Sequence, residues 1–132
     1  RRAMTEADGI FVRAHGGVSR EKTVDLYSRA HGLLHLHRWE EPMGLVPIES
    51  MACGCVPIAM KRGGPAETIH HGVTGFLVDS DEEAAELIKR DAVKEISPEV
   101  MRAHVEQHFG LKVFIDAWEK LLEGVALAGE RW

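Results

Sequence analysis

The chain has 132 residues, of which 45% are apolar and 28% charged, and its 16 Lys and Arg against 21 Asp and Glu give a formal net charge of −5. This length and balance predict one folded domain over residues 1–132 and exclude a disordered or low-complexity chain. The acidic balance argues against nucleic acid as a partner, and no apolar run approaches the roughly eighteen residues of a membrane span.

The first elements predicted along the chain are a strand and a helix. The segment Gly9 to His15 has the β-branched and aromatic content of a short strand, and Gly16 and Gly17 end it. Ser19 is a suitable N-cap for a helix from Arg20 to Ala30, in which apolar residues recur at close to helical spacing.

Two more strands and a helix are predicted in the middle of the chain. Leu33 to His37 reads as a strand, and after a loop an apolar helix runs from Leu45 to about Cys53. Val56 to Met60 reads as the next strand, although Pro57 is unusual inside a sheet.

The last part of the chain is predicted to be mostly helical. Gly63 and Gly64 precede a short helix that ends near His70, and Gly75 to Val78 forms a very short strand. Three helices then follow: one capped by Asp79 or Ser80 and ending at Arg90, one opened by Ser97-Pro98-Glu99, and one from about Leu111 to Leu127.

Short apolar strands that alternate with helices predict parallel pairing through right-handed crossovers. The expected fold class is therefore α/β, a Rossmann-like open parallel sheet with helices on both faces. In such sheets ligands bind outside the carboxyl ends of the strands. The loops at residues 15–19, 37–44, 60–65 and 78–80 are accordingly expected to carry the site.

The segment from Trp39 to Gly54 is the most informative for chemistry. Gly44 stands where the chain enters a helix, and a helix N-terminus favours an anion such as phosphate. Glu41 precedes that helix and Glu49 lies in its second turn. Carboxylates do not bind phosphate, but they accept hydrogen bonds from paired hydroxyls. The pattern predicts a ligand with a sugar on each side of a phosphate group, as in a nucleoside diphosphate sugar.

From Glu41 to Glu49 the segment resembles the E-x7-E motif of retaining GT-B glycosyltransferases, the glycosyl transferases of group 1 that include glycogen, sucrose and lipopolysaccharide synthases. The resemblance covers roughly residues 10–80. It rests on motifs in the family's order and spacing: Gly16-Gly17-Val18-Ser19, Leu26-Tyr27-Ser28-Arg29-Ala30, Glu41-Pro42-Met43-Gly44-Leu45, Met51-Ala52-Cys53-Gly54, Gly63-Gly64-Pro65-Ala66-Glu67 and Gly72-Val73-Thr74-Gly75-Phe76-Leu77-Val78.

The resemblance implies a role for individual residues. Glu41 would be the catalytic-site residue that holds hydroxyls of the donor sugar, and Glu49 would take the ribose diol. The amides of Met43, Gly44 and Leu45 would face the sugar and diphosphate, and His15 and Gly16 would lie by the base. The reaction would retain the anomeric configuration by front-face attack assisted by the leaving phosphate, without a metal or another cofactor.

The resemblance also implies what lies outside the chain. The sequence is expected to be the partial C-terminal, nucleotide-sugar-binding half of a GT-B fold, without its opening strands and their cationic diphosphate clamp. An N-terminal acceptor-binding domain would be the missing partner, so the fragment alone is expected to be inactive. A cytoplasmic location is expected because no apolar signal core follows Arg1 and Arg2, and peripheral membrane association of a longer parent is left open.

Two other functions are compatible with the same sequence pattern. The same fold could serve as a non-catalytic scaffold or regulatory module, or as a sugar-nucleotide epimerase or hydrolase. The family usually has Pro-Ser where this chain has Leu36-His37, Phe at Met43, Ala at Ser50 and Pro-Val at Val56-Pro57. None of these departures removes a carboxylate.

The remaining candidate residues are expected to have structural rather than ligand-binding roles. Glu40 is expected on the surface, and Gly63 and Gly64 either form a simple turn or border the donor cleft. Lys61 and Arg62 are expected in a solvated loop, with phosphate contact as the alternative. No third ligand stands at recognisable spacing from His35 and His37 or from His70 and His71, and Cys53 and Cys55 are expected to stay reduced, so no metal is predicted. Several large apolar residues are assigned to the core: Met43, Met51, Met60, Phe114 and Trp118.

Overall fold

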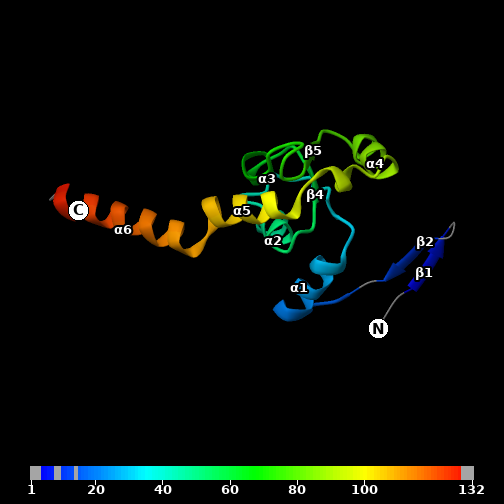
Figure 1. Cartoon of the computed structure of the whole chain (residues 1–132), viewed down its shortest axis with the longest axis horizontal. Helices are drawn as coiled ribbons and strands as arrows, with labels where there is room; N and C mark the ends of the chain where they lie inside the picture. The colour runs from blue at the N-terminus through cyan, green and yellow to red at the C-terminus, as the bar shows by residue number, and fades with distance from the viewer. Residues whose placement is uncertain (1–3, 8–9, 14, 129–132) are drawn as a thin grey trace.

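The computed structural model describes residues 4–7, 10–13 and 15–128 of the chain (Figure 1). Helices and strands alternate through the middle of the sequence, and two helices close it. The elements are β1 (Met4–Ala7), β2 (Ile10–Arg13), α1 (Arg20–Arg29), β3 (Leu33–His35), α2 (Leu45–Ala52), β4 (Pro57–Met60), α3 (Gly64–Thr68), β5 (Phe76–Val78), α4 (Asp81–Lys89), the 3-10 helix η1 (Ala92–Glu95), α5 (Pro98–Phe109) and α6 (Leu111–Ala128).

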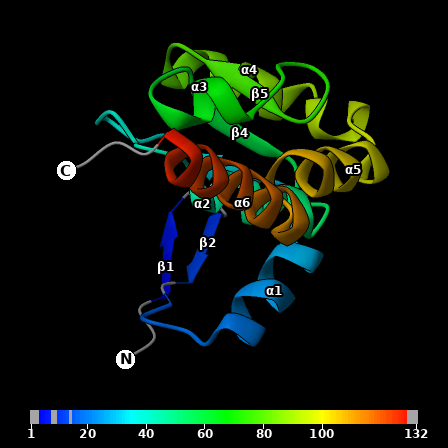
Figure 2. The ribbon, with the colours of Figure 1, turned by 90° about the vertical axis from the view of Figure 1, so that its left-hand side faces the viewer.

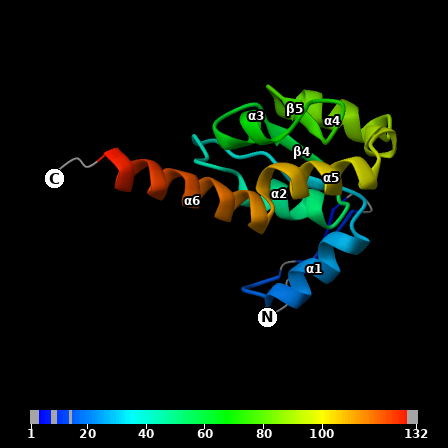
Figure 3. The ribbon, with the colours of Figure 1, turned by 60° about the vertical axis from the view of Figure 1, so that its left-hand side comes forward.

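The central sheet has the strand order β3-β4-β5, and both pairings are parallel. All four residues of β4 are buried, so this middle strand is covered on both faces. In Figure 3, α2 and α5 lie on one side of β4, and α3 and α4 lie on the other. The α/β fold class predicted from the alternation of strands and helices is confirmed.

The predicted first strand does not join this sheet. Its described part, β2, pairs antiparallel with β1 in a separate two-stranded sheet, which Figure 2 shows at a distance from β4 and β5. Only two positions separate the two strands, and so short a connection permits antiparallel pairing alone, whereas a parallel crossover needs a dozen or more residues. The segment Met4–Ala7 was not predicted as a strand.

Local sequence signals set several helix boundaries. Ser19, Ser80 and Ser97 each cap a helix through the side-chain oxygen, which accepts a hydrogen bond from the backbone amide three residues later. Pro57 is the first residue of β4. A missing N–H group is tolerated at the start of a strand, so this proline is compatible even with the middle position in the sheet.

The core lies between β4, β5 and the helices α2 and α5. Met51 and Met101 are fully buried, and Met60 is 3% exposed. The assignment of Met51 and Met60 to the core is therefore confirmed. The assignment was wrong for three residues, because Met43 is 47%, Phe114 60% and Trp118 49% exposed. Met43 lies in the loop before α2, and the two aromatic residues lie on α6.

The last helix is amphipathic but projects from the body of the molecule. In Figures 1 and 3 it extends away from the sheet, and every side chain from Leu111 to Val125 is exposed. Its periodicity was sufficient to predict a helix. Periodicity identifies an apolar face but not the surface that covers it.

We expect Met51→Ala to lower the free energy of unfolding by about 2–5 kcal/mol, since it removes a fully buried side chain from the core. The matched change on α6 is Leu121→Ala, at a residue that is 56% exposed. It should cost less than about 1 kcal/mol. Chemical denaturation followed by circular dichroism measures both values. Equal losses for the two variants would contradict this description of the core.

Candidate functional site

The loops that follow β3 and β4 meet at the carboxyl ends of these parallel strands. The Gly64 amide donates a 2.6 Å hydrogen bond to the carbonyl oxygen of Glu41. A Cβ atom at Gly63 would lie 2.4 Å from that oxygen, and one at Gly64 would lie 2.3 Å from the carbonyl carbon of Met43. Since no side chain fits at these distances, the two glycines border the loop that carries Glu41 and do more than turn the chain.

The Glu41 carboxylate is held through one of its oxygens. The indole Nε1 of Trp39 donates a 2.9 Å hydrogen bond to Oε2, and Nε2 of His35 lies 3.9 Å from the same oxygen. The Glu41 side chain is 19% exposed. Within the described part of the chain, no hydrogen bond reaches the other oxygen, Oε1. A hydroxyl group of a ligand can donate to it.

Two side chains at the start of α2 are exposed, whereas Gly44 before them and Pro47 and Ile48 after them are buried. Leu45 is 58% exposed and Val46 is 37% exposed. The first amides of an α-helix have no acceptor within the helix and favour an anion. Gly44 caps the helix at φ 78° and ψ 52°, in the left-handed region, and a Cβ there would lie 2.9 Å from Cγ of Pro65. Backbone conformation and packing on α3 therefore both require this glycine, whereas the close approach of a ligand stays a prediction.

Glu49 faces a different part of the molecule. It lines a cavity of about 150 Å³ between α1 and α2, together with Arg20, Thr23, Val24, Tyr27, Ala52 and Cys53. Burial raises the pKa of the Tyr27 phenol, and the negative charge of Glu49 raises it further. The phenol stays protonated at neutral pH and can donate a hydrogen bond. Sequence reasoning did not select Arg20 or Tyr27, because only the packing of α1 on α2 brings them to Glu49.

The structure does not bring the two predicted acids into that cavity together, because Glu41 is not among the residues that line it. His15 and Gly16, which the resemblance places by the base, are exposed in the segment before α1 and do not line it either. A ligand that reached both Glu41 and Glu49 would therefore cross the exposed first turn of α2. That turn is not sealed inside the protein.

His37 and Arg62 link the two loops on the other side of Glu41. His37 is 4% exposed, and its Nε2 lies 3.1 Å from the carbonyl oxygen of Arg62. The Arg62 guanidinium donates a 2.9 Å hydrogen bond to the carbonyl oxygen of Arg38 and lies 3.7 Å from the Glu40 carboxylate. These contacts give His37 and Arg62 a structural role, and Glu40 is exposed on the surface as expected.

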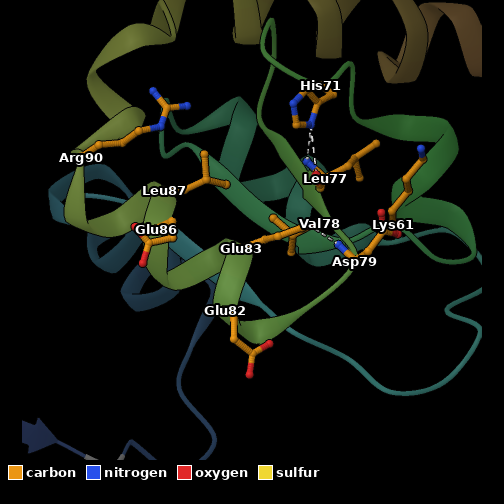
Figure 4. A pocket seen from close by; sticks show the side chains of 10 residues that line it. All are labelled: Lys61, His71, Leu77, Val78, Asp79, Glu82, Glu83, Glu86, Leu87 and Arg90. Carbon is orange, nitrogen blue, oxygen red and sulfur yellow. Dashed lines mark hydrogen bonds between the residues drawn. The ribbon is translucent and has the colours of Figure 1, made fainter.

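A larger cavity of about 630 Å³ lies between β5 and α4 (Figure 4). Four carboxylates line it, those of Asp79, Glu82, Glu83 and Glu86, against the two cationic groups of Lys61 and Arg90. The dashed lines in Figure 4 include the contacts of His71 Nδ1 with the amide and the carbonyl oxygen of Leu77. The excess of negative charge disfavours a diphosphate here, so its size alone does not make this cavity the better site. Lys61 lines this cavity and not the one between α1 and α2.

Neither a metal nor a membrane helix is indicated by the described residues. Within them no group of three or more His, Cys, Asp or Glu side chains is arranged to hold a metal ion. In the same part of the chain, no helix combines the length and the hydrophobicity that a membrane span requires.

A family model described as "Glycosyl transferases group 1" matches residues 9–104. Among curated proteins, the human "Alpha-1,3/1,6-mannosyltransferase ALG2" is 36% identical over 81 residues, which cover 58% of this chain and 20% of the relative. "Sucrose synthase 4" of Oryza sativa subsp. japonica is 37% identical over 85 residues, which cover 61% of this chain and 10% of the relative. The chain thus spans only a small part of the curated relatives that it matches.

Solved structures agree with these matches. The crystal structure of the Anabaena protein HepE in complex with UDP has a TM-score of 0.65 and 27% sequence identity, and covers 74% of this chain and 29% of that protein. The complex of the same protein with UDP-glucose has a TM-score of 0.57 over the same shares of the two chains.

Proposed function

The chain belongs to the family of glycosyl transferases of group 1, and we propose that it supplies the donor-binding part of an enzyme that transfers a sugar from a nucleoside diphosphate sugar with retention of configuration. Two kinds of similarity support this proposal. The curated relatives include a mannosyltransferase and a sucrose synthase, and the structural neighbour was solved with UDP and with UDP-glucose. The acceptor would bind to sequence outside this chain.

The observation that carries the proposal is the hydrogen bonding of the Glu41 carboxylate. One of its oxygens accepts a hydrogen bond from Trp39, and the other has no partner in the described part of the chain. The N-cap of α2, Gly44, follows three residues later, and the exposed Leu45 and Val46 come directly after it. In the proposed complex, Oε1 of Glu41 accepts hydroxyl groups of the donor sugar. The amides of Met43, Gly44 and Leu45 face the sugar and the diphosphate at the positive end of the helix.

The cavity between α1 and α2 would take the nucleoside side of the donor. Glu49 accepts hydrogen bonds from both ribose hydroxyls, and the protonated Tyr27 phenol supplies a donor beside it. His15 and Gly16 are proposed to lie by the base through backbone contacts. In this arrangement the donor lies across the first turn of α2, with Glu41 at its sugar end and Glu49 at its nucleoside end.

The chemistry proposed is that of the family which the sequence resembles. The bond between the anomeric carbon and the phosphate oxygen breaks, and its electron pair goes to the diphosphate. The acceptor oxygen attacks from the face that the phosphate leaves, and its proton passes to that phosphate oxygen. The helix amides stabilise the charge that develops on the leaving group, and no side chain acts as a nucleophile.

We expect Glu49→Ala to weaken binding of UDP-glucose to the natural full-length protein by about 10–100-fold, since hydrogen bonds to a charged group contribute about 1.5–3 kcal/mol. Isothermal titration measures the dissociation constant. The control is Glu106→Ala, at an exposed carboxylate on α5. Equal binding by the Glu49 variant and the unmodified protein would count against the ribose role. NMR of the anomeric proton of the product tests retention separately.

A further inference from the structure

Two ring nitrogens converge on a single carboxylate oxygen at the end of β3. Nε1 of Trp39 is 2.9 Å from Oε2 of Glu41, and Nε2 of His35 is 3.9 Å from it. The side chains of His35 and Glu41 are only 15% and 19% exposed. The three groups come from the last residue of β3 and from the loop behind it, which Gly63 and Gly64 fix against the loop after β4.

His35 Nε2 is a buried polar atom without a hydrogen-bond partner among the described residues. Leaving such a group unpaired costs about 1–3 kcal/mol, and native structures rarely retain one without a reason. In the described part of the chain, the carboxylate oxygen that faces Nε2 is Glu41 Oε2, which lies about 1 Å beyond a normal hydrogen-bond length for a contact of this kind. Hydrogen bonds at sites without ligand are often long and tighten when substrate binds.

The rings beside His35 restrict the direction in which it can move. The His35 and His37 ring centroids are 4.8 Å apart, and those of His37 and Trp39 are 5.8 Å apart. His37 is itself anchored to the carbonyl oxygen of Arg62. His37 therefore fixes one side of the His35 ring, and the short adjustment that pairs Nε2 brings the ring and the Glu41 carboxylate closer together.

We propose that His35 and Trp39 are positioning residues for Glu41: both hold Oε2, which turns Oε1 towards the sugar hydroxyls of the donor. This inference rests on the proposed function, because it names the residues that orient the carboxylate proposed to bind the sugar. Hydroxyls that bind Oε1 pull the carboxylate into one orientation, and His35 Nε2–H then closes on Oε2. A carboxylate fixed through Oε2 presents Oε1 to the sugar hydroxyls in a single geometry, which favours one stereochemical class of sugar.

The charges around His35 are consistent with this role. Burial lowers the pKa of His35, the neighbouring His37 lowers it further, and the Glu41 carboxylate acts in the opposite direction. The ring is therefore neutral at neutral pH, and in the proposed pair it is the Nε2–H tautomer that would donate to Oε2. Among the described residues, the titratable groups that act on the ring are His37 and Glu41.

A first test needs no activity. NMR titration of His35 should give a lower pKa in Glu41→Gln than in the unmodified protein, because the variant removes the facing negative charge. Glu40→Gln, one position earlier and exposed, should leave the His35 pKa unchanged. An unchanged His35 pKa in Glu41→Gln would overturn the inference, whatever reaction the protein catalyses.

The second test separates positioning from folding. His35→Leu keeps the volume but removes the donor, and it should lower kcat/KM for the donor sugar by about 10–100-fold with no fall in Tm. Trp39→Phe should act in the same direction. His35→Gln, whose amide can donate, should recover most of the loss, and His108→Leu on the exposed face of α5 is the control.

The outcomes separate this inference from the proposed function. Full activity in His35→Leu, or a parallel fall of activity and Tm in both His35 variants, would overturn the positioning role while the proposed transfer stands. Absence of transfer and of UDP-glucose binding in the unmodified full-length protein would overturn the proposed function. The NMR titration would then still decide whether His35 and Glu41 are paired.

Discussion

Replacing Glu41 with Gln is expected to lower sugar transfer by about 10²–10³-fold, the range found when one preorganised polar group is removed from an active site. The amide keeps the volume of the carboxyl group and can still accept the hydrogen bond from Trp39 Nε1. It lacks the negative charge that makes the carboxylate a strong acceptor for hydroxyl groups. The effect should therefore appear in kcat/KM with little change in the free energy of unfolding.

Glu40→Gln is the matched control for that experiment. The Glu40 side chain is 77% exposed, and in the described part of the chain its ion-pair partner is Arg62, at 3.7 Å. An exposed pair of this kind contributes about 0–1 kcal/mol, so this variant should retain full activity. Kinetics with a radiolabelled donor compare the two variants directly. Similar activities for them would show that the carboxylate at position 41 has no special role.

Gly63→Ala is expected to destabilise the protein by about 3 kcal/mol or more and to abolish donor binding. At φ 56° and ψ −146° the backbone conformation is one that glycine alone adopts easily, and forcing another residue into such a region costs about 1–3 kcal/mol. The added Cβ would also lie 2.4 Å from the carbonyl oxygen of Glu41. Relief of that collision has to displace the loop that carries Glu41.

Gly72→Ala separates the effect of backbone strain from the effect of the collision with Glu41. Gly72 also has a positive φ, 75°, but a Cβ there would meet nothing within 4 Å. It should cost about 1 kcal/mol from backbone strain and leave binding of UDP-glucose unchanged. Urea denaturation and calorimetric titration provide the comparison. The proposed packing of the two loops would be refuted if Gly63→Ala bound UDP-glucose as tightly as Gly72→Ala does.

The match to the group 1 glycosyl transferases includes the residues that these predictions concern. The family model covers residues 9–104, a range that contains Glu41, Gly63 and Glu49. It leaves out α6 and its exposed apolar face. The elements proposed to bind the donor can therefore be tested residue by residue on the present fold.

The sequence by itself determined the elements whose signals are local. Ser19, Ser80 and Ser97 mark helix starts because a serine hydroxyl caps the amide three residues ahead. The apolar runs before and after α2 predicted parallel strands, and the order of motifs identified the family. These predictions succeeded because caps, turns and periodicity depend on residues within a few positions of one another.

Only the tertiary structure decided which distant groups meet. It paired β2 with β1, placed Arg20 and Tyr27 beside Glu49, and left Trp118 of α6 exposed. It also set Gly63 and Gly64 against the backbone of Glu41 and brought the His35 ring to the Glu41 carboxylate. Such contacts follow from the packing of whole strands and helices, so residue type and spacing specify the groups available but not the partner that each one finds.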